Sequence, residues 1–551
     1  MLYKMSPPVS LENRMATSIQ SASAANPNSY DLQPYPSISF PESHPLRLAA
    51  IGRLFGVNAV PPSTARVLEL GCADGANLLP MADLLQKARF LGIDASKVQI
   101  TNGQKALEAS GLKNVELRFQ NILDFPAAEG KFDYIIVHGI FSWVPEPVRE
   151  KIMQICAEHL SENGLAYISY NALPGWNLRR SLRDMMLFHT QQIADPVTKV
   201  KQSRALLNFL TENVPTENNA YGMLLKADSE FMSKQPDNYI RHDILEEENT
   251  PFYLYEFAAR AGKQGLQYVG EPSLSQMLAS NFPDKVRDTL SKVGAGVIAQ
   301  EQYMDFLRNR SFRQTILCRS TTVINRQIQP ASMVAFALQS RFKALEKPVD
   351  LTAGVSVGFV SVAGPTVNTA DPFLKAAMQA LIAAAPAPVP YSTLLDLARR
   401  SSRPFLGNLP PNRDQIDEST LQLNLLNLYS RGFAEIFAEP VPLATSVPVK
   451  PALSPLARFQ VANSRYVANR LHGPVPADEV ARSIMAVCDG TRTHNEIVTA
   501  MIARVHEGKL SVKEGDRPVT ADPKLRSLLA PQVDAILRRL LAGAFFAPDA
   551  D

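Results

Sequence analysis

A glycine-rich turn after a short apolar segment is the part of the chain whose residue types indicate ligand binding. Val67–Leu70 is apolar except for Glu69, and Gly71 and Gly75 flank Ala73 in the turn that follows. Small residues allow the backbone to approach a ligand closely. The turn has neither the Gly-Lys-Ser/Thr of a phosphate-binding loop nor the Gly-x-Gly-x-x-Gly of dinucleotide sites. The pattern therefore favours a ligand without a phosphate group.

A second acidic residue follows at a spacing that suits a ribose. The short apolar segment Phe90–Ile93 ends at Asp94. An acid about 20 residues after the first glycine, at the end of the second strand, can bind a pair of ribose hydroxyls. The alternative is that Asp94 caps the next helix, and the two roles are compatible.

With these residues in place, the turn resembles motif I of class I S-adenosylmethionine (SAM) methyltransferases, Glu-x-Gly-x-Gly-x-Gly, with Ala73 in place of the central glycine. The resemblance implies SAM as the cofactor, a ligand with an amino acid, a sulfonium and an adenosine. By position, Asn121 and Ile122 fall where this superfamily contacts adenine. The cofactor-binding residues that we expect are Tyr35, His44, Glu69, Gly71, Ala73, Gly75, Asn77, Asp94, Ala95, Asn121, Ile122 and His138.

Tyr35 and His44 belong to a proline-rich segment that precedes the turn. In methyltransferases the segment before motif I often lies across the cofactor, so we expect a lid over the adenosine. A strap along the edge of the sheet is the alternative, and His44 itself has a purely structural alternative.

The only two tryptophans, Trp143 and Trp176, follow the predicted strands 132–138 and 164–171. Tryptophans in exposed loops are costly unless they line a pocket or an interface. With Phe141 and Tyr170 they predict an aromatic channel beside the methyl donor. Such a channel favours a neutral amine by desolvation.

Two polar residues at the same strand ends complete the predicted catalytic set. His138 can accept a proton or orient a water, or it can be a hydrogen-bonded residue near the cofactor. Asn171 can position the amine. The catalytic candidates are therefore His138, Trp143, Tyr170, Asn171 and Trp176.

Three longer segments, Tyr30–Pro45, His138–Pro145 and Tyr170–Trp176, resemble the rickettsial-type protein lysine methyltransferases, whose bacterial relatives carry a methyltransferase regulatory domain. The similarity covers most of 30–325 and, more weakly, the remainder. It implies a SAM-dependent methyltransferase that acts on lysine side chains of a protein. The alternatives are a small-molecule N- or O-methyltransferase and a SAM-binding regulator that acts through its C-terminal modules.

The residues after the fourth strand, His138-Gly139-Ile140-Phe141, differ from the Asp/Asn-Pro-Pro-aromatic sequence of enzymes that methylate DNA bases. This difference argues against a nucleobase substrate. The helix predicted at 417–431, which would read DNA in a winged helix, carries five leucines and one basic residue, Arg431. A DNA-reading helix is expected to be basic, so we expect protein contacts and no nucleic acid.

The order of the predicted elements indicates an α/β chain. We expect a Rossmann-like class I methyltransferase domain, a mostly helical regulatory region and C-terminal winged-helix-like modules. Apolar alternation suggests further strands near Leu351 and at 355–362. The expected parts are a disordered tail (1–28), the SAM-binding domain with its lid (29–190), the helical regulatory domain (191–330) and winged-helix-like modules (331–440 and 457–551).

Composition sets the remaining expectations. The 551 residues are 46% hydrophobic and 20% charged, with a net charge of +3, which is typical of a soluble protein. The four cysteines lack metal-ligand spacing, as do the histidines, so we expect free thiols in a reducing compartment and no metal. Without a membrane span or signal peptide we expect a cytoplasmic location.

Overall fold

The structure is a computed structural model that describes residues 38–407, 410–514 and 517–548. The predicted tail 1–28 and Tyr35 lie outside the described residues.

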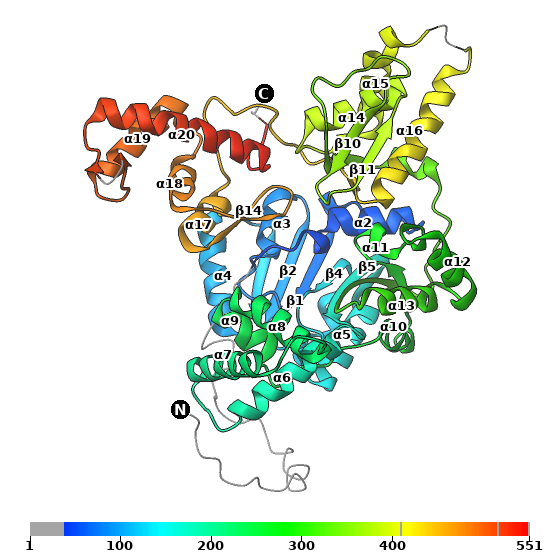
Figure 1. The fold of residues 1–551 in the computed structure, drawn as a ribbon, viewed down its shortest axis with the longest axis vertical. Coiled ribbons are helices and arrows are strands. Elements are labelled where there is room, and N and C mark those ends of the chain that lie inside the picture. The colour runs from blue at the N-terminus through cyan, green and yellow to red at the C-terminus, as the bar shows by residue number, and fades with distance from the viewer. Residues whose placement is uncertain (1–37, 408–409, 515–516, 549–551) are drawn as a thin grey trace.

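A seven-stranded sheet of order β3-β2-β1-β4-β5-β7-β6 forms the centre (Figure 1). Its neighbours are parallel except that β7 is antiparallel to β5 and β6. The strands are β1 (Arg66–Leu70), β2 (Arg89–Asp94), β3 (Val115–Phe119), β4 (Phe132–Val137), β5 (Leu160–Asn171), β6 (Leu266–Gly270) and β7 (Phe312–Arg319).

Alternate residues of β5 build two cores, because successive side chains of a strand point to opposite faces. Leu165 and Tyr167 pack with helices α2, α3 and α4, whereas Ile168 and Tyr170 pack with α5 and α10. These helices are α2 (Pro45–Leu54), α3 (Leu78–Leu84), α4 (Lys97–Ser110), α5 (Glu146–His159) and α10 (Leu254–Lys263).

The sheet continues past the boundary that we predicted at residue 190. Its strands β6 and β7 come from the segment 191–330, which we expected to be a separate helical domain. The segment predicted as the regulatory region therefore shares its sheet with the predicted SAM-binding domain. Pairing of β7 with β5 joins residues about 145 positions apart, as in Tyr170 with Arg313, and local periodicity cannot predict such a contact.

Helices fill the connection between β5 and β6 and the one between β6 and β7. The first connection begins with helices that share an apolar core and lead into a π-helix, Ile240–Ile244, and α10 follows before β6. Besides α10, the helices of the two connections are α6 (Trp176–Thr190), α7 (Pro196–Asn213), α8 (Ala220–Ser233), α9 (Asp237–Tyr239), α11 (Leu274–Met277), α12 (Asp284–Val293) and α13 (Val297–Arg308).

A middle module combines three helices with two small sheets, β12-β8-β13 and β11-β10-β9. The expected strand near Leu351 is wrong: this residue lies in a loop, where Pro348 and Gly354 interrupt an extended pattern. The elements are β8 (Ala337–Ser340), β9 (Phe342–Ala344), β10 (Val357–Ser361), β11 (Thr366–Thr369), α14 (Pro372–Ala384), β12 (Val389–Pro390), α15 (Tyr391–Ser402), α16 (Arg413–Ser430) and β13 (Ala434–Phe437).

A C-terminal module has a separate apolar core. It comprises α17 (Pro455–Asn463), β14 (Tyr466–Ala468), β15 (Pro474–Pro476), α18 (Glu479–Val487), α19 (His494–His506), β16 (Lys513–Glu514), β17 (Arg517–Pro518) and α20 (Asp522–Ala542). Among the described residues, no helix is long and apolar enough to cross a membrane.

Both modules dock on the central domain (Figure 1). Helix α17 packs on α4 and α3, while β13 packs on α2. Polar contacts secure the second interface: Arg47 pairs with Glu435 at 3.2 Å, and Arg53 donates to the carbonyl of Ala438 at 3.0 Å. The N-terminal part of the central domain therefore contacts chain segments several hundred residues away.

Candidate functional site

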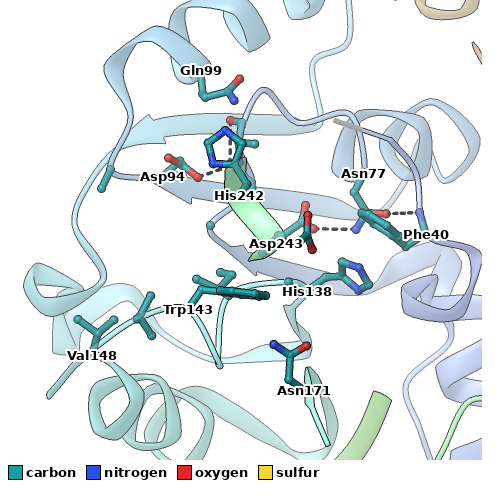
Figure 2. A pocket seen from close by; sticks show the side chains of 18 of the residues that line it. Phe40, Asn77, Asp94, Gln99, His138, Trp143, Val148, Asn171, His242 and Asp243 are labelled. Carbon is teal, nitrogen blue, oxygen red and sulfur yellow. Dashed lines mark hydrogen bonds between the residues drawn. The ribbon is translucent and has the colours of Figure 1, made fainter. Parts of the chain in front are cut away.

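A cavity of about 560 Å³ lies at the carboxyl ends of β1, β2, β4 and β5. Doubly wound sheets bind ligands at this edge, and the volume lies in the range of small-molecule sites. Asp94 and Gln99 lie on one side of the cavity, and Trp143 and Asn171 on another (Figure 2). The cavity is lined by these predicted residues: Glu69, Gly71, Ala73, Asn77, Asp94, Ala95, Asn121, Ile122, His138, Trp143, Asn171 and Trp176.

The glycine-rich turn folds tightly against the end of β2. Gly71, Ala73 and Gly75 all have left-handed φ values, of 69°, 49° and 78°. At Gly71 a side chain would also collide with Ile140, since a Cβ there would lie 2.2 Å from its Cδ1. Ala73 donates its N–H to Asp94 Oδ2 at 2.9 Å. The same carboxylate therefore faces the cavity and holds the turn.

The cap of helix α4 comes from the neighbouring serine. Ser96 Oγ accepts the N–H of Gln99 at 3.2 Å, while Asp94 Oδ1 accepts the N–H of Ser96 at 2.8 Å. Because Ser96 is the N-cap, the alternative reading of Asp94 as the cap of α4 is wrong. Asp94 instead fixes the two backbone segments on either side of the cavity floor.

Glu69 is buried at the bottom of the cavity. Its Oε1 accepts a hydrogen bond from Asn77 Nδ2 at 2.7 Å, and within the described residues Oε2 has no hydrogen-bond partner. Burial raises the pKa of this carboxyl to about 8, against the opposing effect of the Asn77 hydrogen bond. Asn77 Oδ1 in turn accepts the N–H of Phe40 at 2.9 Å (Figure 2). A polar chain thus joins the floor to the segment before α2.

His138 lies between aromatic rings. Its imidazole stacks on Phe40 with ring centroids 3.6 Å apart, and its Nδ1 lies 2.9 Å from the hydroxyl of Tyr167. Gln314 donates to that hydroxyl at 3.0 Å, which leaves the phenolic proton to donate to Nδ1. Burial lowers the pKa of His138 to about 3. The geometry therefore favours a neutral imidazole whose Nε2 carries the proton, over the general base that we considered.

The two tryptophans meet in the wall of the cavity. Their ring centroids are 6.0 Å apart and the planes make an angle of 84°, an edge-to-face arrangement that aromatic pairs prefer. The guanidinium of Arg179, which also lines the cavity, lies 5.8 Å from the Trp176 ring. Asn171 is close by, and its Nδ2 donates to Asn249 Oδ1 at 3.1 Å. This part of the cavity wall is therefore apolar, with a hydrogen-bonded amide and a cation beside it.

Tyr170 and Phe141 do not reach the cavity, and their expected place in the channel is wrong. Tyr170 stacks on Phe257 with centroids 4.1 Å apart and bonds to Thr315 Oγ1 at 3.1 Å. Phe141 packs in the same core. For Tyr170 the reason is strand alternation: Asn171 faces the cavity, so the preceding residue must face the opposite side of β5.

Two predicted cofactor contacts are also absent from the lining. Gly75 lies behind the turn, packed toward Leu79 and Leu117. His44 is buried at the start of α2, where its Nδ1 accepts the N–H of Leu46 at 3.1 Å and acts as the N-cap. His44 therefore has the structural role that was the alternative to a place in the lid.

The most important residues that the sequence analysis missed come from beyond β5. Tyr239, His242 and Asp243 line the cavity from the end of α9 and the π-helix, joined by Arg179 and Phe312. Figure 2 shows His242 and Asp243 on one short segment. π-helical turns are frequent at functional sites, but the sequence Ile-Arg-His-Asp-Ile has no local signature that announces one.

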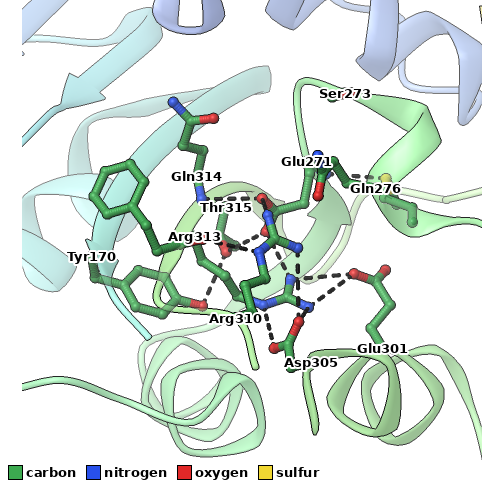
Figure 3. Close-up of polar contacts among 12 residues, drawn as sticks. Tyr170, Glu271, Ser273, Gln276, Glu301, Asp305, Arg310, Arg313, Gln314 and Thr315 are labelled. Carbon is green, nitrogen blue, oxygen red and sulfur yellow. Dashed lines mark hydrogen bonds and ion pairs between the residues drawn. The ribbon is translucent and has the colours of Figure 1, made fainter. Parts of the chain in front are cut away.

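A buried ionic cluster fixes the start of β7 beside the cavity (Figure 3). Arg313 contacts Asp305 through two bonds of 2.7 and 2.9 Å, Glu271 at 2.8 Å and Glu301 at 3.2 Å. Arg310 binds the other oxygen of Glu271 at 2.7 Å. The backbone beside these arginines then holds the loop after β5: Gly175 donates to the carbonyl of Arg310 at 2.9 Å. The cluster therefore supports the segment that carries Asn171 and Trp176.

Among the residues that the structure describes, no three His, Cys, Asp or Glu side chains form a group that could hold a metal ion. The four cysteines, Cys72, Cys156, Cys318 and Cys488, are buried free thiols. Burial raises the pKa of Cys156 to about 12, so this thiol is not a nucleophile at neutral pH.

Comparison with known families matches three parts of the chain. Residues 67–164 match a methyltransferase domain, 236–319 a predicted methyltransferase regulatory domain, and 450–545 the C-terminal winged helix domain of PKMT. The second match begins just before the π-helix that lines the cavity.

Similar proteins cover almost the whole chain. A protein of Rickettsia prowazekii (strain Madrid E) described as uncharacterized is 35% identical over 527 residues, 93% of each chain. Another from that organism is 40% identical over 239 residues, 43% of this chain and 96% of its own. The structure of PKMT2 from Rickettsia typhi in complex with AdoHcy aligns with a TM-score of 0.83 and 30% identity, over 93% of this chain and all of that one.

Proposed function

This chain belongs to the family of the rickettsial PKMT proteins, SAM-dependent methyltransferases with a regulatory and a C-terminal winged helix domain, and from that premise we propose that it methylates lysine side chains of a protein substrate. The Trp143–Trp176 pair in the cavity wall is the observation that carries the proposal. An apolar aromatic wall of this kind favours a neutral amine by desolvation.

The cofactor, in this proposal, lies over the turn after β1. Asp94 accepts the ribose hydroxyls, for which a carboxylate that already accepts two N–H groups keeps acceptor capacity. Asn121 and Ile122 flank the adenine, and Glu69 faces the amino-acid end with its Oε2. A carboxyl with a raised pKa at this place becomes an anion more readily when an ammonium group binds beside it.

The acceptor then approaches from the side of the tryptophans. SAM supplies an activated methyl group, which transfers in line to the lysine Nζ as the carbon–sulfur bond breaks and AdoHcy leaves. The lysine ammonium must first release a proton to water, because its ordinary pKa is about 10.4. An apolar aromatic wall and the nearby Arg179 guanidinium both disfavour the ammonium form. Asn171 orients the neutral amine for attack.

The same rings tolerate the product. A methylated ammonium is attracted to aromatic faces by about 0.5–2 kcal/mol, so an acceptor can remain or return for another transfer. Asp243 and His242, from the segment that matches the regulatory domain, also line the cavity. We propose that this segment contributes to recognition of the acceptor.

The experiment uses the full chain with methyl-labelled SAM and cell lysate separated into protein and small-molecule fractions. We expect label on protein, and peptide mass spectrometry should locate it on lysine Nζ. Label that appears only in the small-molecule fraction would assign the enzyme to small-molecule N- or O-methylation instead. The Trp143→Ala variant in parallel tests whether the labelling depends on the proposed channel.

A further inference from the structure

The loop between β14 and β15 carries a histidine of the C-terminal module into the central domain. His472 is 2% exposed, and its Nε2 lies 2.9 Å from Asn77 Oδ1. Asn77 directly follows the glycine-rich turn and lines the cavity. His472, a residue of the C-terminal module, therefore contacts a side chain that lines the cavity.

The direction of this hydrogen bond follows from its neighbours. The backbone N–H of Phe40 can only donate, so the Asn77 atom that it contacts must be the carbonyl oxygen. His472 Nε2 contacts the same oxygen and must therefore donate as well. The amide nitrogen of Asn77 then donates to Glu69 Oε1 at 2.7 Å. One ordered chain of donors runs from His472 through Asn77 to Glu69.

The surroundings of His472 keep it neutral. The groups that face it are the imidazole of His44, whose ring centroid is 5.0 Å away, and the guanidinium of Arg47. Burial, together with these two groups, lowers the pKa of His472 well below its usual value. A neutral imidazole has a single N–H, and the contact with Asn77 places it on Nε2.

The loop holds His472 in a conformation that a non-glycine residue rarely adopts, with φ of 66°. Asn469 fixes it: its Oδ1 accepts the N–H groups of Leu471 and Gly473, at 3.1 and 2.7 Å, and its Nδ2 donates to the carbonyl of Gly543 at 2.8 Å. A strained backbone conformation of this kind persists where surrounding contacts hold it in place, and such conformations are concentrated at functional sites.

We propose that His472 is a positioning residue for cofactor binding, through which the C-terminal module orients Asn77 and Glu69. Correctly oriented, Glu69 presents Oε2 to the amino-acid end of SAM. Coupling of this kind is reciprocal, so cofactor binding also strengthens the docking of the module. The inference rests on the proposed placement of SAM over the β1 turn and is independent of the methyl acceptor.

The test compares His472→Leu with His472→Gln in the full chain. The leucine variant removes the donor, and we expect Kd and KM for SAM to rise about five- to tenfold, as loss of one buried hydrogen bond predicts. The kcat at saturating SAM and the KM for the acceptor should stay unchanged. The glutamine variant keeps an N–H donor and should recover most of the affinity. Equal SAM affinity in wild type and the leucine variant would overturn the proposal.

Leu471→Ala is the matched control, because it loosens the apolar contact of the same loop without touching Asn77. It should lower the melting temperature but leave the SAM Kd unchanged. A double-mutant cycle with Asn77→Ala then tests the route: in that background His472→Leu should add nothing. Additive losses would show that His472 acts only through general stability and would contradict the proposal.

A measurement on the unmodified protein covers the case in which a variant does not fold. Hydrogen exchange should show that AdoHcy increases protection of residues 466–476, and unchanged exchange there would refute the coupling. Failure of the underlying cofactor placement has a different signature: Asn77→Ala and Glu69→Gln would then both bind SAM as tightly as wild type.

Discussion

Trp143 and Trp176 touch edge to face, at 84° and 6.0 Å between ring centroids, although they follow different strands of the sheet. The contact joins the loop after β4 to the start of α6. Because both rings line the cavity, they form one wall, and a change in either ring changes the surface that the acceptor meets.

Replacement of either tryptophan by alanine is therefore expected to reduce turnover and to leave cofactor affinity nearly unchanged. Loss of the wall should cost about 3 kcal/mol of barrier stabilisation, about a hundredfold in kcat. Calorimetry with AdoHcy and initial rates on a lysine-containing protein substrate measure the two quantities. Phe substitutions, which keep an aromatic ring, are the controls and should retain most activity. Alanine variants that melt early but keep full specific activity while folded would rule out the channel.

Asp94 is expected to control cofactor affinity. Asp94→Asn keeps the size of the side chain but removes its negative charge. The carboxylate accepts the N–H of Ala73 and is proposed to accept the ribose hydroxyls. Hydrogen bonds to charged groups contribute about 1.5–3 kcal/mol, so the SAM Kd should rise at least tenfold. Calorimetry tests this against Glu116→Gln, a change on the exposed part of β3. Equal affinity of Asp94→Asn and wild type would exclude Asp94 from the site.

The buried carboxyl of Glu69 predicts a pH dependence of stability in the cofactor-free protein. Its pKa is raised from 4.5 to about 8, so between these values the folded chain keeps a proton that the unfolded chain releases. The contribution of this carboxyl to stability should consequently fall as the pH rises from about 4.5 to about 8, with no further loss from it above that range. Glu69→Gln should remove this contribution, so the difference in stability between the two proteins should change across the range. Denaturant unfolding across the pH range measures both proteins, and parallel curves would refute the assignment.

Removal of Arg313 should destabilise the whole protein. Its side chain is 1% exposed and pairs with Asp305, Glu271 and Glu301, so Arg313→Leu leaves these buried acids short of positive charge, at a cost of about 3–5 kcal/mol. Chemical denaturation should show this loss, whereas Arg538→Leu, on an exposed pair with Asp534, should change stability little, because solvent screens such pairs. Comparable effects of the two changes would contradict a structural role for the cluster in Figure 3.

The middle and C-terminal modules are expected not to bind DNA. Helix α16 begins at Arg413, earlier than the predicted 417, but this added arginine pairs with Asp417 at 2.7 Å and Asp414 follows it. The helix therefore offers little net positive charge to phosphates. A mobility-shift titration at about 150 mM salt should show no specific complex. Tight binding that weakens steeply with salt would favour the regulator hypothesis over a protein-contact role.

Sequence alone determined the features that depend on local patterns. Helix α4 shows such a pattern, because a serine cap and a glycine in the left-handed conformation mark its two ends. The turn after β1, the acid at the end of β2 and the tryptophans beyond β4 and β5 were all found by spacing, since parallel strands bring their carboxyl ends to one edge. The methyltransferase family followed from the same residues.

Tertiary structure decided which of these side chains share the cavity. Tyr170 points away from the cavity because side chains alternate along β5. Whether Tyr170 or Asn171 faces the cavity depends on the register in which β5 pairs with its neighbours. His242 and Asp243 enter from a π-helix, and His472 arrives from 395 residues beyond Asn77. Such contacts depend on how separate elements pack, and packing is set by the whole chain and not by any local stretch of it.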